Sequence, residues 1–380
     1  MLKLKIIHIV QDEKFSEGVI STWNRENRFT NRVVFLNKPT YRCKFLKNIS
    51  SIEFVWRRTA IIDLLQGDYD VLFFHSLPSG LWKYFKWIPK NKTVVWWAWG
   101  YDIYSKQRGC EPLIQLQLYK EQSARIIKKQ SWKSMAIEHL KSMAGDLYYN
   151  HVRERVLGRI DYFLSPVELE KELISKEHPV FRPKDFSLQF NNREFRMIEK
   201  KDLGIVLGNS SSLSNNHLDI LQSLEKIGVK GHRVVIPLSY GDMDYKELVK
   251  RELSKGKFMH NNECILLEHY LTKEEYYQIT DSCSFLISGA IRQQALGNIK
   301  HAFLTGKKVF MYSNSVLFSF FKSKGFHVYE LENVCKEDFM KELSEDMAIE
   351  NYLLMREWIE SRRKVYENFV QECLGKKQAN

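Results

Sequence analysis

Short apolar runs bounded by polar or turn-forming residues recur along both halves of the chain, with longer amphipathic stretches between them. Such runs are typical of strands buried on both faces of a parallel sheet. The sequence predicts strands within the ranges 4–10, 31–37, 69–76, 92–100, 160–166, 203–209, 232–240, 263–271, 283–289 and 307–313. Two successive alternations of strand and helix predict an α/β fold, with two Rossmann-like domains that face each other across a cleft.

The stretches between the predicted strands indicate helices. They are expected near 80–88, over most of 111–160, from Ser165-Pro166, and over 215–227, 243–254, 272–282, 294–306 and 346–376. Thr272 and Glu275 form a capping-box pattern, which marks the start of one of these helices. The helix over 346–376 is long and amphipathic, as expected of a helix that packs one face on a domain.

A domain boundary is expected near the midpoint of the chain. Residues 178–200 there lack a clear hydrophobic period and contain two prolines. The prediction is a first domain at 1–185, a linker at 186–202, a second domain at 203–345 and a C-terminal helix at 346–380. The C-terminal helix is expected to pack back toward the first domain.

The formal net charge of +12 lies entirely in the first half. Residues 1–200 hold 34 basic and 22 acidic residues, a difference of 12, whereas residues 201–380 hold 24 of each. This asymmetry predicts an anionic partner for the first domain, either nucleic acid or an acidic membrane surface. The alternative is that the charge serves solubility alone.

Other features of the composition indicate a soluble protein of a reducing cytoplasm. No apolar run approaches the roughly 20 residues that cross a bilayer. The start, MLKLKIIHIV, is too short for the apolar region of a signal peptide, and is interpreted as a strand. The six cysteines form no C-x-x-C pair, which argues against a disulfide framework or a zinc site.

Candidate binding residues follow the predicted strands, because ligands of parallel sheets lie beyond the carboxyl ends of the strands. The run GNSSSLSNN, from Gly208 to Asn216, joins a strand to a helix N-terminus, an arrangement that can hold a phosphate without a metal. Arg292 follows another strand, and its planar fork suits a diphosphate. The alternative for the run is a helix cap, and the alternative for Arg292 is a surface ion pair. The candidate nucleotide-binding residues are Gly208, Asn209, Ser210, Ser211, Tyr240, Glu268, Tyr270, Arg292, Gln293 and Gln294.

Acid–base candidates occupy the corresponding positions of the first domain. They are Asp102, Asp12, His75 and His8, of which His8 is also explained as a core histidine. Aromatic neighbours could desolvate Asp102 and raise its pKa toward the working pH. An aspartate two residues after a glycine can instead hold the turn, so both roles for Asp102 remain open.

Several common catalytic motifs are missing from the sequence. There is no G-x-G-x-x-G after the first strand of either half, no Walker loop, no H-E-x-x-H and no G-x-S-x-G. D-x-D occurs at 68–70 and 242–244, and both copies are interpreted as solvated loops. No metal site is therefore predicted.

Four motifs in register, WGYDIY, GNSSSLSNNH, VVIPLSYG and IRQQALGN, resemble the bacterial 4-alpha-L-fucosyltransferase family, glycosyltransferase family 56. The resemblance implies a GT-B fold and an inverting, metal-independent transferase without a cofactor. It implies a nucleotide-sugar donor, expected to be dTDP-linked, and a polyprenyl-diphosphate-linked saccharide acceptor. It also implies a role for Asp102 and places the nucleotide diphosphate at 208–210, Tyr240 and 292–294.

The combined expectation is a transferase of surface-polysaccharide synthesis that moves a deoxy-amino or fucose-type sugar. It would lie in the bacterial cytoplasm, peripheral on the inner membrane, with the acceptor and anionic lipid on the first domain and no nucleic acid bound. Arg292 and the helix N-terminus would stabilise the departing diphosphate. The alternatives are a nucleotide-sugar epimerase on the same fold and a nucleic-acid-binding protein that uses the basic half.

Overall fold

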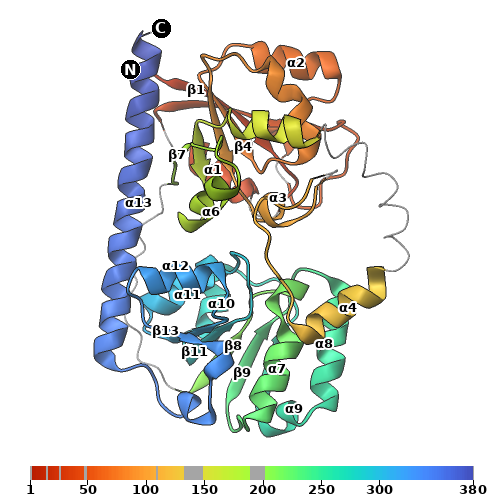
Figure 1. The fold of residues 1–380 in the computed structure, drawn as a ribbon, viewed down its shortest axis with the longest axis vertical. Helices are drawn as coiled ribbons and strands as arrows, with labels where there is room; N and C mark the ends of the chain where they lie inside the picture. Colours follow the sequence, from red (N-terminus) through yellow and green to blue (C-terminus); the bar gives the residue numbers. More distant parts are fainter. Residues whose placement is uncertain are drawn as a thin grey trace. The chain divides into compact units, whose positions relative to one another are not determined.

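The structure, a computed structural model, describes residues 2–13, 16–24, 27–46, 49–107, 110–131, 149–188 and 202–379 (Figure 1). The chain divides into two compact units. The first comprises residues 1–115, 138–190 and 361–380, and the second comprises residues 116–137 and 191–360. Each unit contains one parallel sheet, so the predicted α/β class and the two Rossmann-like sheets are confirmed.

The first unit is built on a seven-stranded sheet of order β3-β2-β1-β4-β5-β6-β7. Its strands are β1 (Leu4–Val10), β2 (Phe29–Phe35), β3 (Glu53–Phe54), β4 (Val71–His75), β5 (Thr93–Trp97), β6 (Tyr162–Leu164) and β7 (Lys184–Asp185). Its helices are α1 (Ser16–Asn24), α2 (Arg58–Gln66), α3 (Tyr101–Tyr104), α6 (Leu169–Glu177), the 3-10 helices η1 (Ile49–Ser51) and η2 (Ser79–Trp87), and the helical residues 149–157. The central strands β1, β4 and β5 are almost entirely buried, which explains their continuous apolar sequences.

Different helices cover the two faces of this sheet. Trp23 of α1 packs on Phe73 of β4 together with Phe369 and Val370, from the last turns of helix α13 (Glu345–Ala379). On the opposite face, Phe85 of η2 stacks on Phe74 of β4, with ring centroids 5.1 Å apart. Helix α2 and the helical residues 149–157 line a common cavity with η2. The aromatic character of the first half is therefore largely a matter of core packing.

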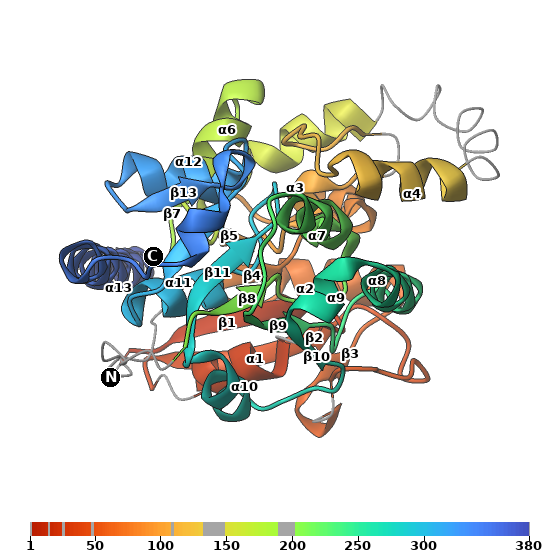
Figure 2. The ribbon, with the colours of Figure 1, turned by 90° about the horizontal axis from the view of Figure 1, so that it is seen from below.

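The second unit is built on a six-stranded sheet of order β10-β9-β8-β11-β12-β13. Its strands are β8 (Gly204–Leu207), β9 (Arg233–Pro237), β10 (Glu263–Leu267), β11 (Cys283–Ser288), β12 (Lys308–Met311) and β13 (Val328–Glu330). Its helices are α7 (His217–Lys226), α8 (Met243–Lys255), α9 (Lys257–Asn261), α10 (Lys273–Thr280), α11 (Leu296–Leu304), α12 (Val316–Ser323) and the 3-10 helices η3 (Leu213–Asn215), η4 (Leu331–Asn333) and η5 (Lys336–Phe339). Helices α7, α8 and α9 cover one face, and α10, α11 and α12 cover the other (Figures 1 and 2). The sheet order reverses at β8 and β11, where such folds bind ligands.

The helix α13 contributes to both units, because the boundary between them falls within its 35 residues, between Glu360 and Ser361. In its first half, Trp358 packs edge-on against Phe320 of α12 in the second unit. In its later turns, Glu367 pairs with Arg28 and Glu372 pairs with Lys184 in the first unit. No helix in the described part of the chain is long and apolar enough to cross a membrane.

The segment 111–131 differs from the predicted long helix. Residues 111–120 are not helical, and α4 begins only at Glu121 and continues to Ser131. Asp219 of α7 accepts hydrogen bonds from the backbone N–H groups of Gln122 and Ser123, at 2.7 and 3.1 Å, and so caps α4. Residues 116–131 thus belong to the second unit, although they fall in the range 1–185 assigned to the first domain. Residues 132–148 lie outside the described residues.

Two further boundaries also differ from the expectation. The predicted linker began at residue 186, but Phe186 is fully buried in the first unit and stacks on Trp23 at 6.2 Å. Residues 189–201 of that linker lie outside the described residues. The helix expected from Ser165-Pro166 begins later, at Leu169, because the Ser165 hydroxyl first closes a turn on Val167. The capping box at Thr272 and Glu275 is present as predicted.

Candidate active site

Three strand exits meet at the carboxyl edge of the second sheet and are joined by side-chain hydrogen bonds. Asn209 follows β8; its Nδ2 donates to the Tyr240 hydroxyl after β9 at 3.0 Å. Gln294 follows β11; its Nε2 donates to Asn209 Oδ1 at 3.0 Å. Ser214 Oγ donates to Gln294 Oε1 at 2.7 Å. Residues from three separate parts of the sequence therefore form one polar cluster, here called the β8 exit cluster.

Backbone geometry allows this close approach. Gly208 has a φ of 73°, which favours glycine, and a Cβ atom there would lie 2.6 Å from His217 Nε2. At Gly289, directly after β11, a Cβ atom would lie 2.1 Å from the carbonyl oxygen of Asn215. Ser211 bridges to Gly241, and its hydroxyl donates to the Tyr240 carbonyl at 2.9 Å. The loop after β8 is thus held against both neighbouring exits.

Two buried side chains of this loop have unused hydrogen-bonding capacity. His217, the first residue of α7, is fully buried, and neither of its ring nitrogens has a partner among the described residues. Asn215 Oδ1 also lacks a partner, while its Nδ2 donates to the Ser210 carbonyl at 2.9 Å. Unpaired buried polar atoms are costly, so a group that satisfies them would stabilise the loop. Their position beside Gly208 is that expected of a site that holds a ligand or an ordered water.

The other predicted nucleotide-binding residues lie at different distances from the cluster. Arg292 and Gln293 follow β11, half-buried, directly before Gln294. Tyr240 has a raised pKa, caused first by burial, to which the nearby Tyr270 also contributes. Tyr270 itself is 79% exposed. Glu268 instead pairs with Lys246 and Lys250 of α8, at 3.1 and 3.0 Å, and these lysines lower its pKa.

Of the polar residues at 215–217, Asn215 and Asn216 lie in the run predicted to hold a phosphate but were not named individually as site residues, and His217 lies just beyond that run. Asn216 adopts a left-handed conformation, with a φ of 52°. Its amide donates to the Gly289 carbonyl at 2.8 Å, and its Oδ1 accepts from the backbone N–H of Lys120 at 2.9 Å. The available signal was the Asn-Asn-His run at a helix start, because asparagine tolerates this conformation.

The buried His217 makes stability depend on pH. Burial lowers its pKa to about 3, so the folded protein excludes a proton that the unfolded chain accepts below pH 6.5. Stability conferred by neutral His217 is therefore complete above pH 6.5 and is lost as the pH falls toward 3. Acidification from pH 6.5 to 5 should cost roughly 2 kcal/mol through this group.

Urea unfolding of the second unit, followed at both pH values, measures this loss. The difference in the free energy of unfolding between pH 6.5 and pH 5 should shrink in His217→Gln. It should persist in His260→Gln, a matched substitution at an exposed position of α9. An unaltered pH response in His217→Gln would contradict the assignment.

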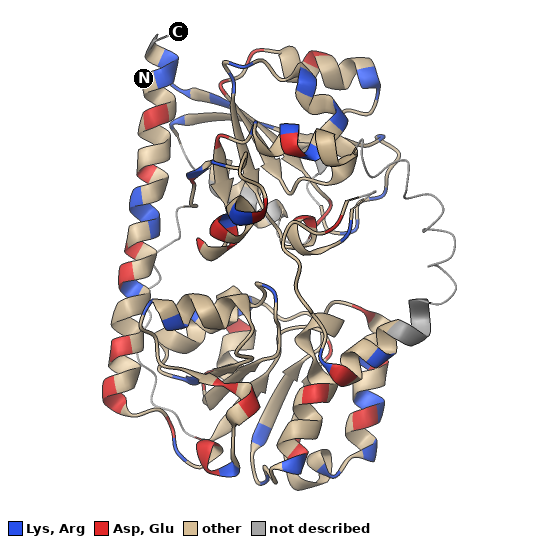
Figure 3. Ribbon diagram, viewed as in Figure 1, with Lys and Arg blue, Asp and Glu red and all other residues tan. Residues whose placement is uncertain are grey.

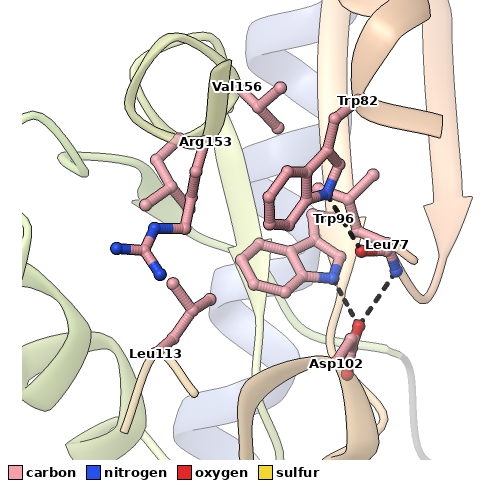
Figure 4. A pocket seen from close by; sticks show the side chains of 8 residues that line it. Leu77, Trp82, Trp96, Asp102, Leu113, Arg153 and Val156 are labelled. Carbon is pink, nitrogen blue, oxygen red and sulfur yellow. Dashed lines mark hydrogen bonds between the residues drawn. The ribbon is translucent and has the colours of Figure 1, made fainter. Parts of the chain in front are cut away.

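In the first unit, Asp102 ties together the loops that follow β4 and β5. Its Oδ2 accepts from the Leu77 backbone N–H at 3.0 Å and from Trp96 Nε1 at 2.8 Å (Figure 4). Its Oδ1 accepts from the Trp99 backbone N–H at 2.9 Å. Burial raises the pKa of Asp102, and this effect exceeds the opposite effect of the three hydrogen bonds, which lower the pKa. The residue is 3% exposed, and the adjacent cavity of about 10 Å³ has room for one water but not for a saccharide.

The histidine candidates form a buried pair. His8 Nε2 lies 3.1 Å from Asn31 Oδ1, and His8 Nδ1 lies 3.0 Å from His75 Nε2. Because Asn31 Oδ1 can only accept, His8 donates to it and accepts from His75. Burial lowers the pKa of His8 to about 4 and holds that of His75 well below its usual value, so both stay neutral. His8 is thus a hydrogen-bonded core histidine.

Asp12 is the one acid–base candidate that is half-buried rather than buried. It follows β1, and its carboxylate accepts three backbone N–H groups of one loop. Oδ2 accepts from Lys44 at 2.7 Å, and Oδ1 accepts from Phe45 and Leu46 at 2.9 and 3.0 Å. Oδ2 therefore retains capacity for one further hydrogen bond.

The described residues contain no group of three or more His, Cys, Asp or Glu side chains that could hold a metal ion. Of the two D-x-D copies, the second begins with Asp242, whose carboxylate caps α8 by accepting from the Tyr245 N–H at 3.0 Å. None of the six cysteines forms a disulfide.

Similarity to solved structures supports the GT-B fold. Anabaena HepE in complex with UDP matches with a TM-score of 0.62 at 9% identity, covering 98% of this chain and 100% of that one. Sucrose-phosphate synthase from Thermosynechococcus elongatus matches with a TM-score of 0.58 at 8% identity, covering both chains completely. At such low identity these likenesses show the fold alone.

The sequence itself matches a family model. The model described as 4-alpha-L-fucosyltransferase, glycosyl transferase group 56, matches residues 56–350, which include the β8 exit cluster and Asp102. The expected resemblance and the enzyme class are therefore confirmed, and the chain belongs to the group 56 family of glycosyltransferases.

Proposed function

We propose that the second unit binds a nucleotide-diphospho-sugar at the β8 exit cluster, with dTDP as the expected nucleotide. The observation that carries this proposal is the convergence of three strand exits at the topological switch point, with unpaired polar atoms of His217 and Asn215 beside Gly208. Arg292 would supply the positive charge that a diphosphate requires. HepE, of similar fold, was crystallised with UDP, which is consistent with a nucleotide on this fold.

The proposed reaction transfers a fucose-type or deoxy-amino sugar to a polyprenyl-diphosphate-linked saccharide bound by the first unit. The acceptor hydroxyl attacks the anomeric carbon from the face opposite the nucleotide. A bond forms between these atoms, the bond from the anomeric carbon to the diphosphate oxygen breaks, and the configuration inverts. Arg292 and the N–H groups after β8 stabilise the charge that develops on the leaving nucleoside diphosphate, without a metal.

We propose Asp12 as the general base that accepts the hydroxyl proton. A base must reach the reacting hydroxyl, and Asp12 is less buried than Asp102 or His75. Three backbone N–H groups fix the orientation of the Asp12 carboxylate, and its Oδ2 can accept one further hydrogen bond. Asp102 is then a positioning residue that fixes the loops after β4 and β5, and His75 is part of the buried pair.

Because the proposed acceptor is lipid-linked, the enzyme is expected to act as a peripheral protein at the cytoplasmic face of the bacterial inner membrane. The excess charge of residues 1–200 supports attraction to anionic lipid. The charge asymmetry equally suits nucleic acid, which the family membership disfavours.

Calorimetry with dTDP, UDP and duplex DNA tests the donor site directly. Binding of dTDP is expected, unchanged by excess EDTA, and binding of DNA is not. A donor panel with extracted polyprenyl-linked saccharides, analysed by mass spectrometry, then identifies the transferred sugar. A folded protein that binds neither nucleotide, or that transfers sugar only after magnesium or manganese is restored, would refute the corresponding part of the proposal.

A further inference from the structure

The first unit carries a second cavity that the proposed reaction does not use. It has a volume of about 450 Å³ and lies between the start of α2, η2 and the helical residues 149–157. None of Asp12, His75 and Asp102 lines it. Its volume is within the range of ligand-binding sites, so its lining indicates what it can hold.

The lining is strongly cationic. Arg58, Lys83, Lys86 and Arg155 are exposed side chains around the cavity, and no carboxylate lines it. Within the residues that the structure describes, none of the four pairs with a carboxylate; Arg155 donates instead to His151 at 3.0 Å. Figure 3 shows basic residues around α2 in blue. An unneutralised group of this kind attracts anions.

Some exposed basic residues elsewhere in the same unit are, by contrast, neutralised by carboxylates. Lys5 pairs with Asp68, and Arg32 forms two hydrogen bonds to Glu53, at 2.7 and 2.8 Å. Helix α2 also begins with Arg58, has no side-chain cap at Arg57 and has no acidic residue in its first turn. Cations at a helix N-terminus oppose the macrodipole, so local helix stability does not explain them.

Aromatic rings lie among the cations. Tyr84 and Trp87 are half-buried, with ring centroids 6.0 Å apart. Lys86 Nζ lies 4.3 Å from the centroid of the Trp87 ring, and Arg58 Cζ lies 5.6 Å from it. Trp56, just before α2, is 44% exposed. Amphipathic aromatic rings beside basic side chains are typical of protein surfaces that contact the interfacial region of a membrane.

We propose that this basic–aromatic cavity binds the phosphate headgroups of anionic phospholipids and docks the first unit on the membrane. The lysines and arginines contact the phosphates, while Tyr84 and Trp87 lie at the level of the headgroups. The inference rests on the proposed membrane location, but not on the proposed donor, acceptor or general base.

Co-sedimentation with vesicles tests the proposal, without donor or acceptor present. Vesicles of equal parts phosphatidylglycerol and phosphatidylcholine are compared with vesicles of phosphatidylcholine alone. The double variant Lys83→Glu/Lys86→Glu should lower the partition coefficient on anionic vesicles by roughly 30-fold or more, since each lysine contributes to attraction near such a surface. The matched control is Lys38→Glu/Lys176→Glu, two exposed lysines of the first unit outside the cavity, and it should have a much smaller effect.

Three outcomes would overturn the proposal. They are equal binding to both kinds of vesicle, equal losses in the two double variants, and calorimetric binding of sodium diphosphate to the cavity without any vesicle binding. The last result would assign the site to a soluble phosphate compound. Because dTDP binding is measured separately on the second unit, failure here is distinguishable from failure of the proposed transferase function.

Discussion

Replacing Arg292 by alanine is expected to lower kcat/KM by roughly 100-fold or more, the usual scale for removing one charge-stabilising donor from an active site. Arg292 follows β11 directly before Gln294, which is joined to Asn209 and Ser214 of the β8 exit cluster. The substitution removes the charge proposed to face the diphosphate. Steady-state kinetics with the identified donor measure the loss, and calorimetry should show weaker dTDP binding.

The matched variant is Arg292→Lys, which keeps the charge and loses the planar fork. It should recover part of the activity but not all of it. Arg251→Ala, at an exposed arginine of α8, controls for the loss of positive charge alone. Near-normal kinetics in a folded Arg292→Ala protein would remove Arg292 from the proposed donor site.

Asparagine at positions 12 and 102 should separate catalysis from positioning. Asp12→Asn is expected to lower turnover by roughly 100-fold or more, because the proposed base is lost. Asp102→Asn places an amide N–H₂ opposite at least one N–H donor of Leu77, Trp96 or Trp99. It should lower the free energy of unfolding by roughly 1–3 kcal/mol, with little change in turnover per folded molecule.

Thermal or urea unfolding and active-site-normalised kinetics on both proteins measure these two effects. Comparison of the pH profiles adds a readout that a structural role would not move, since only the general base sets the acidic limb of kcat. A stable Asp102→Asn protein with a large fall in turnover would return the base to Asp102. Normal turnover of Asp12→Asn would exclude Asp12.

The sheets were predictable from the sequence because their strands are buried on both faces. Runs such as VLFFH at 71–75 and CSFLIS at 283–288 are wholly buried, so apolar residues dominate them and no Asp, Glu, Lys or Arg interrupts them. The predicted ends of the strands β8, β9 and β11 pointed to Gly208, Asn209, Tyr240 and Gln294 as site residues, and the structure brings these residues together. These residues lie close together because the carboxyl ends of parallel strands meet at one edge of a sheet. A single sequence is enough to predict this arrangement.

Features that depend on distant partners could not be predicted. The cap of α4 is Asp219, 97 residues from Gln122, so no local pattern marks where that helix begins or which unit it joins. The sequence predicted that aromatic neighbours desolvate Asp102. It did not predict the hydrogen bond to Asp102 Oδ2 from the Leu77 N–H, because Leu77 follows a different strand, β4. Glu268 has the position of a site residue, yet the lysines of α8 hold it.

The path of α13 has a consequence for how the protein is made. The first unit is synthesised first, but one face of its sheet is covered by Phe369, Val370 and Cys373, which leave the ribosome only after the whole second unit. Until then Trp23 and Phe73 lack part of their packing, and the nascent first unit exposes an apolar surface. Its folding is therefore expected to finish after translation of the second unit, and chaperones that bind apolar segments are expected to hold it in the interval.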